Sequence, residues 1–185
     1  MGAREILAAL EKSRAAIDRV QAPSSPGVYA IFLRGTSELP LRDGAPNGLI
    51  YIGMSGNLAA REYDMHFSSL NTGVSTLRRS IGALLKEELA LVAIPRGTGR
   101  AESNYRNYRF KPDGEDRLTA WMKGSLEVGV HPTAGDHEAV EKVLIAALQP
   151  PLCLTGWPNP QAGFVKAGRK GISADTSAPI GTSIA

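Results

Sequence analysis

Two short segments containing tyrosine and glycine constrain this chain more than any other feature. Residues 26–33 contain Gly27-Val28-Tyr29, and residues 49–53 contain Tyr51-Ile52-Gly53. Aromatic and β-branched residues bounded by Pro or Gly are typical of β-strands. If the two strands pair, Tyr29 and Tyr51 come close together. Two neighbouring phenols are consistent with simple packing and also with a site that handles protons.

The composition is that of an ordinary globular chain of 185 residues with a net charge of +3. No apolar run approaches the ~20 residues that a membrane-spanning helix needs. Glu5, Glu11 and Lys12 interrupt any secretory signal pattern, and the single Cys153 excludes both an intrachain disulfide and a cysteine-based metal site. We therefore expect a cytoplasmic protein that does not associate with membranes. The charge is compatible with a polyanionic partner but indicates one only weakly.

Hydrophobic periodicity and turn residues predict a single α+β domain over residues 23–160. An amphipathic helix is expected over 4–20, within an N-terminal segment 1–22. The small and polar residues of 161–185 predict a largely disordered C-terminal tail. Further helices are expected over 55–70, 75–89 and 136–148, and a strand over 105–110.

Glu141 occupies an informative position in the predicted helix over 136–148. It lies at the edge of the apolar stripe, where a carboxylate is costly to bury unless it has a cationic or metal partner. A boundary glutamate whose carboxylate reaches water explains the position equally well. Arg61 and His66 are, taken singly, also consistent with ordinary surface or packed residues.

Taken in order, these residues resemble the GIY-YIG nuclease superfamily. The resemblance rests on the two tripeptides, on Arg61 ten residues after Tyr51, and on the Glu141-x-x-Leu144-Ile145 helix that ends at Pro150. It covers roughly residues 26–155. It implies a small mixed or antiparallel β-sheet flanked by helices. It also implies an active site on the sheet that hydrolyses phosphodiester bonds in DNA with one divalent metal, Mg²⁺ or Mn²⁺.

The resemblance implies a role for each site residue. Glu141 would hold the metal, and Arg61 would neutralise charge on the scissile phosphate. Tyr51, with Tyr29 beside it, would orient and deprotonate the attacking water. His66 is a further candidate, although five residues along an ideal helix point it about 140° away from Arg61.

The chain departs from the family pattern at three supporting positions. A histidine often follows the arginine by four residues in the family, whereas that position here is Met65 and the histidine is His66. Met54 and Cys153 stand where many members have a lysine or similar polar residue and an asparagine, and Asn159 is a candidate substitute for the latter. These departures leave open an alternative: a catalytically weak or inactive nucleic-acid-binding module with the same fold. A domain that serves protein association is a third possibility. The sequence leaves RNA as a substrate and the oligomeric state open.

Two further groups of residues suggest contacts with nucleic acid. Arg78 and Arg79, near a predicted helix start, could bind backbone phosphates, although a solvated basic helix face explains them equally well. The run from Tyr105 to Arg109 interleaves aromatic and basic residues, a pattern that suits single-stranded nucleic acid and also an exposed edge strand.

Overall fold

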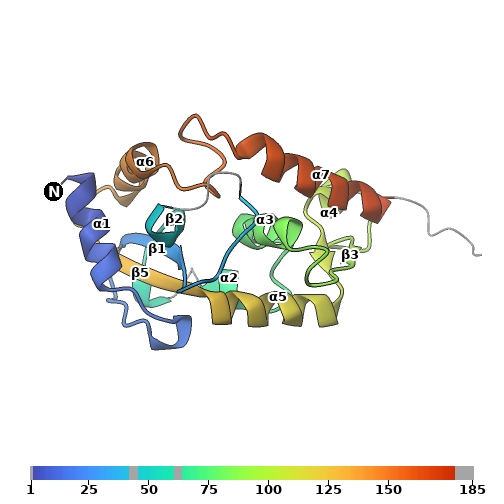
Figure 1. Cartoon of the computed structure of the whole chain (residues 1–185), viewed down its shortest axis with the longest axis horizontal. Helices are drawn as coiled ribbons and strands as arrows, with labels where there is room; N and C mark the ends of the chain where they lie inside the picture. The colour runs from blue at the N-terminus through green and yellow to red at the C-terminus, as the bar shows by residue number, and fades with distance from the viewer. Residues whose placement is uncertain (1, 42–45, 61–63, 178–185) are drawn as a thin grey trace, which may run out of the picture.

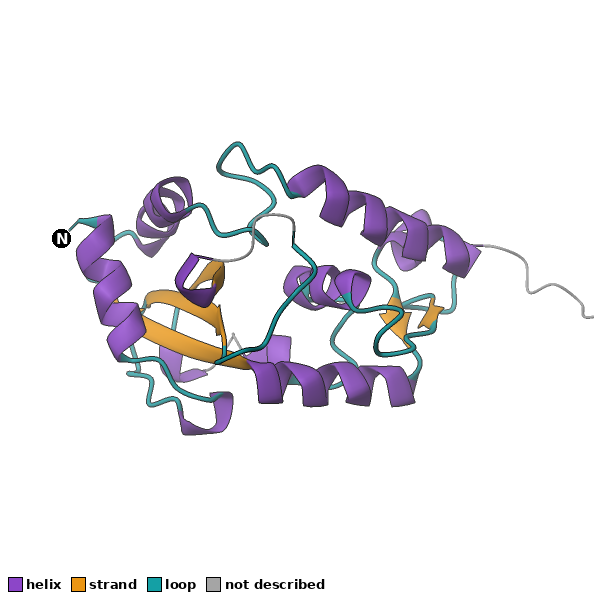
Figure 2. Ribbon diagram, in the orientation of Figure 1, coloured by secondary structure: helices purple, strands orange, loops and turns teal. Residues whose placement is uncertain are grey.

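A computed structural model describes residues 2–41, 46–60 and 64–177. It confirms the α+β class: an antiparallel three-stranded sheet lies at one end of the molecule and a group of helices at the other (Figures 1 and 2). Strand β1 (Gly27–Leu33) lies between β2 (Leu49–Ser55) and β5 (Leu126–Pro132). A smaller sheet pairs β3 (Ala93–Ile94) with β4 (Arg109–Phe110).

The central strand β1 is buried on both faces, which explains its nearly continuous apolar sequence. Successive side chains of a strand point to opposite faces. Val28, Ala30 and Phe32 share a core with helices α1 (Ala3–Lys12) and α6 (His137–Leu148), whereas Tyr29 and Ile31 belong to the core on the other side. The sheet is therefore a middle layer, with Tyr29 on the face opposite α1.

The Tyr29 side of the sheet shares its core with a second group of helices. These helices are α2 (Asp64–Phe67), α3 (Thr76–Leu84) and α5 (Pro112–Ser125). Helix α3 begins as predicted, because the Ser75 hydroxyl accepts a hydrogen bond from the Arg78 backbone N–H at 3.1 Å. The chain also forms short 3₁₀ helices, η1 (Ile17–Arg19), η2 (Pro46–Gly48) and η3 (Leu58–Ala60). None of the described helices is long and apolar enough to cross a membrane.

Four predicted elements differ from the structure. The helix expected over 75–89 is shorter, because α3 ends at Leu84. The helix expected over 4–20 ends at Lys12, because Ala15 exchanges two backbone hydrogen bonds with Val128 at the edge of the sheet. The helix expected over 55–70 is instead η3 followed by the short α2. The strand expected over 105–110 is α4 (Glu102–Arg106) followed by β4. For the helix expected over 4–20, a tertiary contact thus outweighs the local pattern.

The prediction for the C-terminal segment differs most from the structure. The sequence predicts a largely disordered tail from residue 161, whereas the structure forms the helix α7 (Ala162–Ser177). Val165 and Ile172 are buried in the core shared with α3, and Lys86 forms an ion pair with Asp175 at 2.8 Å. Two apolar residues seven positions apart lie on one face of a helix, and that spacing was obscured by the surrounding glycines and polar residues.

Candidate active site

The pairing of β1 with β2 brings the two motif tyrosines together. Tyr29 is directly opposite Gly53, and Tyr51 is opposite Ile31, so the tyrosines are diagonal neighbours across the strand pair. Their ring centroids are 6.3 Å apart. Tyr29 is buried and Tyr51 is half-buried, which leaves Tyr51 as the phenol nearer to solvent.

The glycines of both tripeptides have a packing role that geometry makes plain. A Cβ added to Gly53 would lie 2.5 Å from the Tyr29 hydroxyl oxygen, so the ring of Tyr29 occupies the space above that glycine. A Cβ added to Gly27 would lie 2.6 Å from Cδ1 of Leu58 and would also overlap the backbone carbonyl of His131. Each glycine therefore makes room for a neighbour that shapes the site.

His66 joins the tyrosines. Its Nε2 lies 2.9 Å from the Tyr29 hydroxyl and its Nδ1 lies 2.8 Å from the Ser75 hydroxyl. The ring centroid is 5.9 Å from that of Tyr29 and 5.7 Å from that of Tyr51. Burial, followed by the charge of Arg78, lowers the pKa of His66 to about 4, so the imidazole is neutral at pH 7. A neutral ring with two polar partners holds Tyr29 in a fixed orientation.

The described part of the predicted helix explains how His66 reaches this position. The angular argument that directs His66 away from Arg61 assumes one continuous α-helix from residue 55 to 70. The structure instead has the 3₁₀ helix η3 over residues 58–60 and the four-residue α2, so that assumption does not apply. Arg61 itself lies outside the described residues, so its predicted role remains a prediction.

Arg78 is a structural residue, and the prediction that it binds backbone phosphates is wrong. Its side chain is fully buried and forms an ion pair with Glu115, also fully buried, at 2.7 Å. It also donates to the His66 carbonyl at 3.1 Å, which ties the ion pair to the histidine of the site. Further hydrogen bonds join the guanidinium to Thr72 and Thr119. With these contacts made inside the core, Arg78 cannot reach a ligand at the surface.

Arg79 is also removed from the surface, with 5% of its side chain exposed. One of its terminal nitrogens donates to the backbone carbonyls of Thr72 and Gly73, at 3.1 and 2.9 Å. Burial, together with the positive charges of Arg169 and Arg96, lowers the pKa of Arg79 to about 10. The predicted phosphate contact is therefore wrong here as well.

Glu141 and Tyr51 line the same pocket, which has a volume of about 340 Å³. Strand β2 supplies Tyr51 and helix α6 supplies Glu141. Asp136 caps the N-terminus of α6, as predicted. Burial, followed by the charge of Glu138, raises the pKa of Glu141. A half-buried carboxylate facing a pocket, where its charged form is disfavoured, is a site at which a cation would bind favourably.

Sequence reasoning missed two cations that line this pocket, Lys166 and Arg169 of α7. Neither forms an ion pair with Glu141 or with any other carboxylate in the described part of the chain. They were missed because α7 was predicted to be disordered. The pocket thus combines one carboxylate, one phenol and two unpaired cations, an arrangement that can receive a phosphate group beside a metal ion.

The Tyr51 hydroxyl is held in an environment that favours the neutral phenol. Burial raises its pKa to about 12, and its electrostatic coupling to the Cys153 thiol and the Glu141 carboxylate adds to that effect. Hydrogen bonds with Thr76 and Tyr29 act in the opposite direction. Tyr51 is therefore protonated at neutral pH, although Lys166 and Arg169 line the same pocket.

Cys153 and Met54, which depart from the family pattern, have distinct surroundings. Cys153 lies against the backbone of β2, with its sulfur 3.4 Å from both the N–H and the carbonyl oxygen of Ile52. Asn159 does not take its place in the pocket, because its amide donates to the carbonyls of Pro151 and Cys153 in the following loop. Met54 is 37% exposed and brings no charge to Tyr51.

The donor set fits a hard divalent cation with a single protein carboxylate. Mg²⁺ is commonly bound through one or two carboxylates, with waters and substrate phosphate completing the shell. Glu141 supplies one carboxylate, and hydroxyls of Thr76, Ser80 and Thr155 line the same pocket. No group of three or more His, Cys, Asp or Glu side chains able to hold a metal occurs among the described residues. A metal here would therefore depend on the substrate for part of its coordination.

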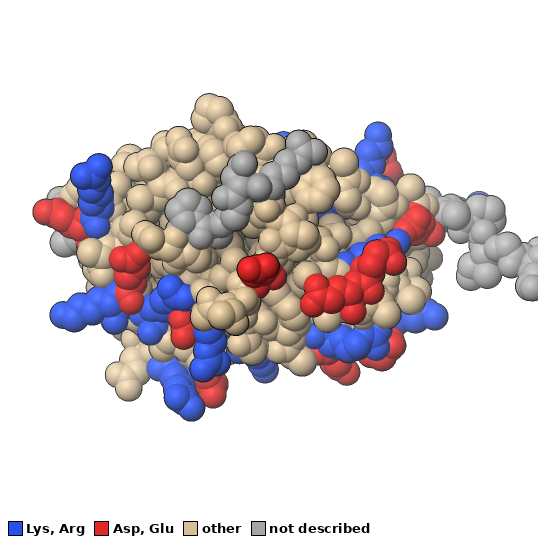
Figure 3. Space-filling view, viewed as in Figure 1, with Lys and Arg blue, Asp and Glu red and all other residues tan. Residues whose placement is uncertain are grey.

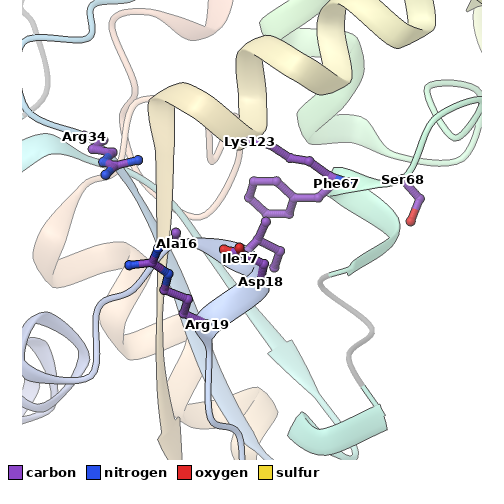
Figure 4. A pocket seen from close by; sticks show the side chains of 8 residues that line it. All are labelled: Ala16, Ile17, Asp18, Arg19, Arg34, Phe67, Ser68 and Lys123. Carbon is purple, nitrogen blue, oxygen red and sulfur yellow. The ribbon is translucent and has the colours of Figure 1, made fainter.

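A separate pocket of about 500 Å³ lies between η1 and the end of α5 (Figure 4). Ile17 and Phe67 form its apolar wall, and its charged side chains are Asp18, Arg19, Arg34 and Lys123. Neither Tyr51 nor Glu141 lines it. We therefore place the candidate active site at the Tyr51–Glu141 pocket.

The fold and the pocket together are those of a small α+β catalytic domain built around a tyrosine pair. Residues 27–167 match the family model described as the GIY-YIG catalytic domain. This chain belongs to the GIY-YIG family, which confirms the resemblance and supports a nuclease-type function. No curated protein and no solved structure matched the chain in the two other comparisons. The family match extends past residue 160 into α7, the helix that carries Lys166.

Proposed function

We propose that this protein is a metal-dependent endonuclease that hydrolyses phosphodiester bonds in DNA. The observation that carries the proposal is the pocket shared by Tyr51 and Glu141, with Lys166 and Arg169 also lining it. The scissile phosphate would lie between the carboxylate and the two cations. Arg61, for which the proposal rests on the family pattern, would contribute a further positive charge.

Tyr51 and Tyr29 would orient and deprotonate the attacking water. The water oxygen attacks phosphorus, one water proton passes to the Tyr51 oxygen, and the bond from phosphorus to the leaving oxygen breaks with its electron pair. Because Tyr51 has a pKa of about 12 in the free protein, this role requires its ionised form to be favoured when substrate binds. Glu141 would hold Mg²⁺ or Mn²⁺, which when bound would stabilise the leaving oxyanion and favour the Tyr51 phenolate.

His66 would act as a positioning residue. Its hydrogen bond to the Tyr29 hydroxyl, 2.9 Å long, fixes the ring that lies beside Tyr51. Its lowered pKa makes it a poor acceptor for the water proton at neutral pH. The neutral imidazole is therefore suited to orient Tyr29 and unsuited to be the final base.

A second function, a nucleic-acid-binding module that does not cleave, is favoured by one observation. The raised pKa of Tyr51, with the uncharged Met54 three residues along β2, leaves the tyrosine without a cation from its own strand. This function predicts salt-dependent binding of DNA without turnover in any metal.

Cleavage of plasmid and branched DNA with Mg²⁺ or Mn²⁺ tests the proposal. We expect the wild-type protein to cleave, EDTA to abolish cleavage, and Glu141→Gln to lower the rate by about 10² or more, because the metal ligand loses its charge. Glu138→Gln is the matched control: Glu138 lies on the same helix and is 56% exposed in an ion pair with Lys142. Its variant should stay within a few-fold of wild type.

Two outcomes would contradict the proposal. Equal cleavage by Glu141→Gln and wild type would remove Glu141 from the mechanism. Wild-type protein that binds DNA in a salt-dependent manner, yet cleaves neither DNA nor RNA in either metal, would establish the binding module instead.

A further inference from the structure

A further pocket shares lining residues of α7 with the candidate active site. It has a volume of about 610 Å³ and lies between α4 and α7. Lys166 and Arg169 line both this pocket and the Tyr51–Glu141 pocket. The two pockets therefore meet at these cations, and together they form a path that leads away from Tyr51. In Figure 1, α4 lies beside α7 at the end of the molecule opposite the sheet.

The charge along this path is positive. Lys166, Arg169, Lys170 and Ser173 are spaced at i, i+3, i+4 and i+7, so they form one stripe along α7. Arg106 of α4 adds a further cation to the same pocket. Glu102 is the acidic residue among the described residues that line it. On the face seen in Figure 3, positive and negative side chains are intermixed.

These cations are available to a ligand. Arg106, Lys166 and Lys170 are exposed, and none of them, nor Arg169, forms an ion pair with a carboxylate among the residues that the structure describes. Phosphate groups spaced along a strand are the ligand that a row of unpaired cations binds best. Because the row begins at the candidate active site, the ligand with the right chemistry is a continuation of the strand that is cleaved.

Tyr105 indicates which form of the strand the groove receives. It is half-buried in the same pocket, next to Arg106 in α4. An aromatic side chain among cations stacks on the face of an unpaired base, whereas the base faces of a duplex are covered by their neighbours. Of the interleaved run noted in the sequence, Tyr105 and Arg106 thus lie on the short helix α4 beside α7, whereas Tyr108 is buried in the core and Arg109 belongs to β4.

We propose that the groove between α4 and α7 binds an unpaired strand of nucleic acid that extends from the candidate active site. Arg106, Lys166, Arg169 and Lys170 contact its phosphates, and Tyr105 stacks on a base. This inference rests on the proposed nuclease function for the identity of the strand. It goes further by assigning a substrate-binding surface and a preference for single-stranded or flapped DNA.

Fluorescence anisotropy with a labelled single-stranded oligonucleotide tests the groove without any need for cleavage. All variants are made in the Glu141→Gln background and measured in EDTA. We expect Arg106→Gln with Lys170→Gln to weaken binding at least tenfold and to lower the salt slope by about 1.4, since each phosphate contact in a single strand contributes about 0.7. Both residues line the α4–α7 pocket and not the Tyr51–Glu141 pocket.

Arg19→Gln with Lys123→Gln is the matched control, because it removes the same charge from exposed residues of the pocket in Figure 4. Its affinity should stay within twofold of the parent. Two variants of Tyr105 distinguish loss of base stacking from a loss of folding. Tyr105→Ala should weaken single-strand binding about tenfold, whereas Tyr105→Phe, which keeps the ring, should retain it. Binding of a blunt duplex should change little in either Tyr105 variant.

Equal affinities of the groove variant and the control would overturn the proposal that the groove binds the strand, even if the wild-type protein cleaves DNA. Equal effects of the Tyr105 variants on single strand and duplex would overturn the preference for an unpaired strand. Conversely, loss of binding in the groove variant of a protein that never cleaves would leave the groove in place and overturn the nuclease proposal alone.

Discussion

At the scale of single residues, the two glycines of the opening motifs are explained by what lies next to them. Gly53 permits the Tyr29 ring to lie across β2, and Gly27 permits Leu58 and the backbone of β5 to approach β1. The sequence predicted that Tyr29 and Tyr51 would be neighbours, because strand pairing follows from local pattern. It did not predict this packing, because the atoms involved are distant in sequence and the register sets their approach.

Gly53→Ala should displace Tyr29 from its position above β2. We expect the substitution to destabilise the fold by about 1–3 kcal/mol, the usual cost of overpacking, and to lower any cleavage rate by at least tenfold, because Tyr29 is pushed away from His66. Urea unfolding and a cleavage assay at a temperature where the variant is folded measure the two effects. Gly56→Ala is the control, since a Cβ there meets no atom within 4 Å. Similar losses in both variants would contradict this account.

At the scale of helices and strands, the boundaries depend on contacts that the sequence does not display. Helices α3 and α6 begin as predicted because Ser75 and Asp136 are local caps. Helix α7 was missed, because its stability depends on the burial of Val165 and Ile172 in the core shared with α3. The angular argument against His66 depended on one continuous α-helix, whereas the described residues of that segment form the 3₁₀ helix η3 and the short α2. Local signals thus predicted where helices start better than which segments a tertiary partner makes helical.

The buried pair of Arg78 on α3 and Glu115 on α5 should control stability and not the affinity for nucleic acid. Arg78→Met leaves the Glu115 carboxylate buried without its ion-pair partner, so we expect a loss of about 3–5 kcal/mol of unfolding free energy. Lys142→Met is the control, because its ion pair with Glu138 is exposed and should contribute less than about 1 kcal/mol. Urea unfolding compares the two variants. If Arg78→Met kept wild-type stability but lost salt-dependent DNA binding, the original phosphate-binding prediction would be restored.

At the scale of the whole molecule, the candidate site lies where the sheet meets the helical end. Tyr51 comes from the sheet, Glu141 from α6 that covers one of its faces, and Lys166 and Arg169 from the last described helix. The sequence could predict Tyr51 and Glu141, because each sits in a local pattern. The cations could not be assigned to the same pocket, because only the docking of α7 on α3 brings them there. The site therefore depends on the integrity of the whole domain.

The titration of buried His66 should change the free energy of unfolding of the whole domain. The pKa of His66 is lowered from 6.5 to about 4 in the folded chain by burial and then by the charge of Arg78, so between these values the unfolded chain binds a proton that the folded chain does not. Unfolding free energy must then fall as the pH decreases from about 6.5 towards 4. Between pH 7 and pH 5 the contribution of His66 amounts to about 2 kcal/mol.

Urea unfolding of the wild type and of His66→Asn at pH 7 and pH 5 measures this contribution, because the carboxylates titrate in both proteins. We expect the wild type to lose about 2 kcal/mol more than the variant between the two pH values. Should His66→Asn be too unstable to compare, the ring protons of His66 can be followed by NMR in the wild-type protein. A midpoint near 6.5 would show that the imidazole is solvated and charged at mildly acidic pH. It would then not be the buried neutral partner that holds Tyr29 beside Tyr51.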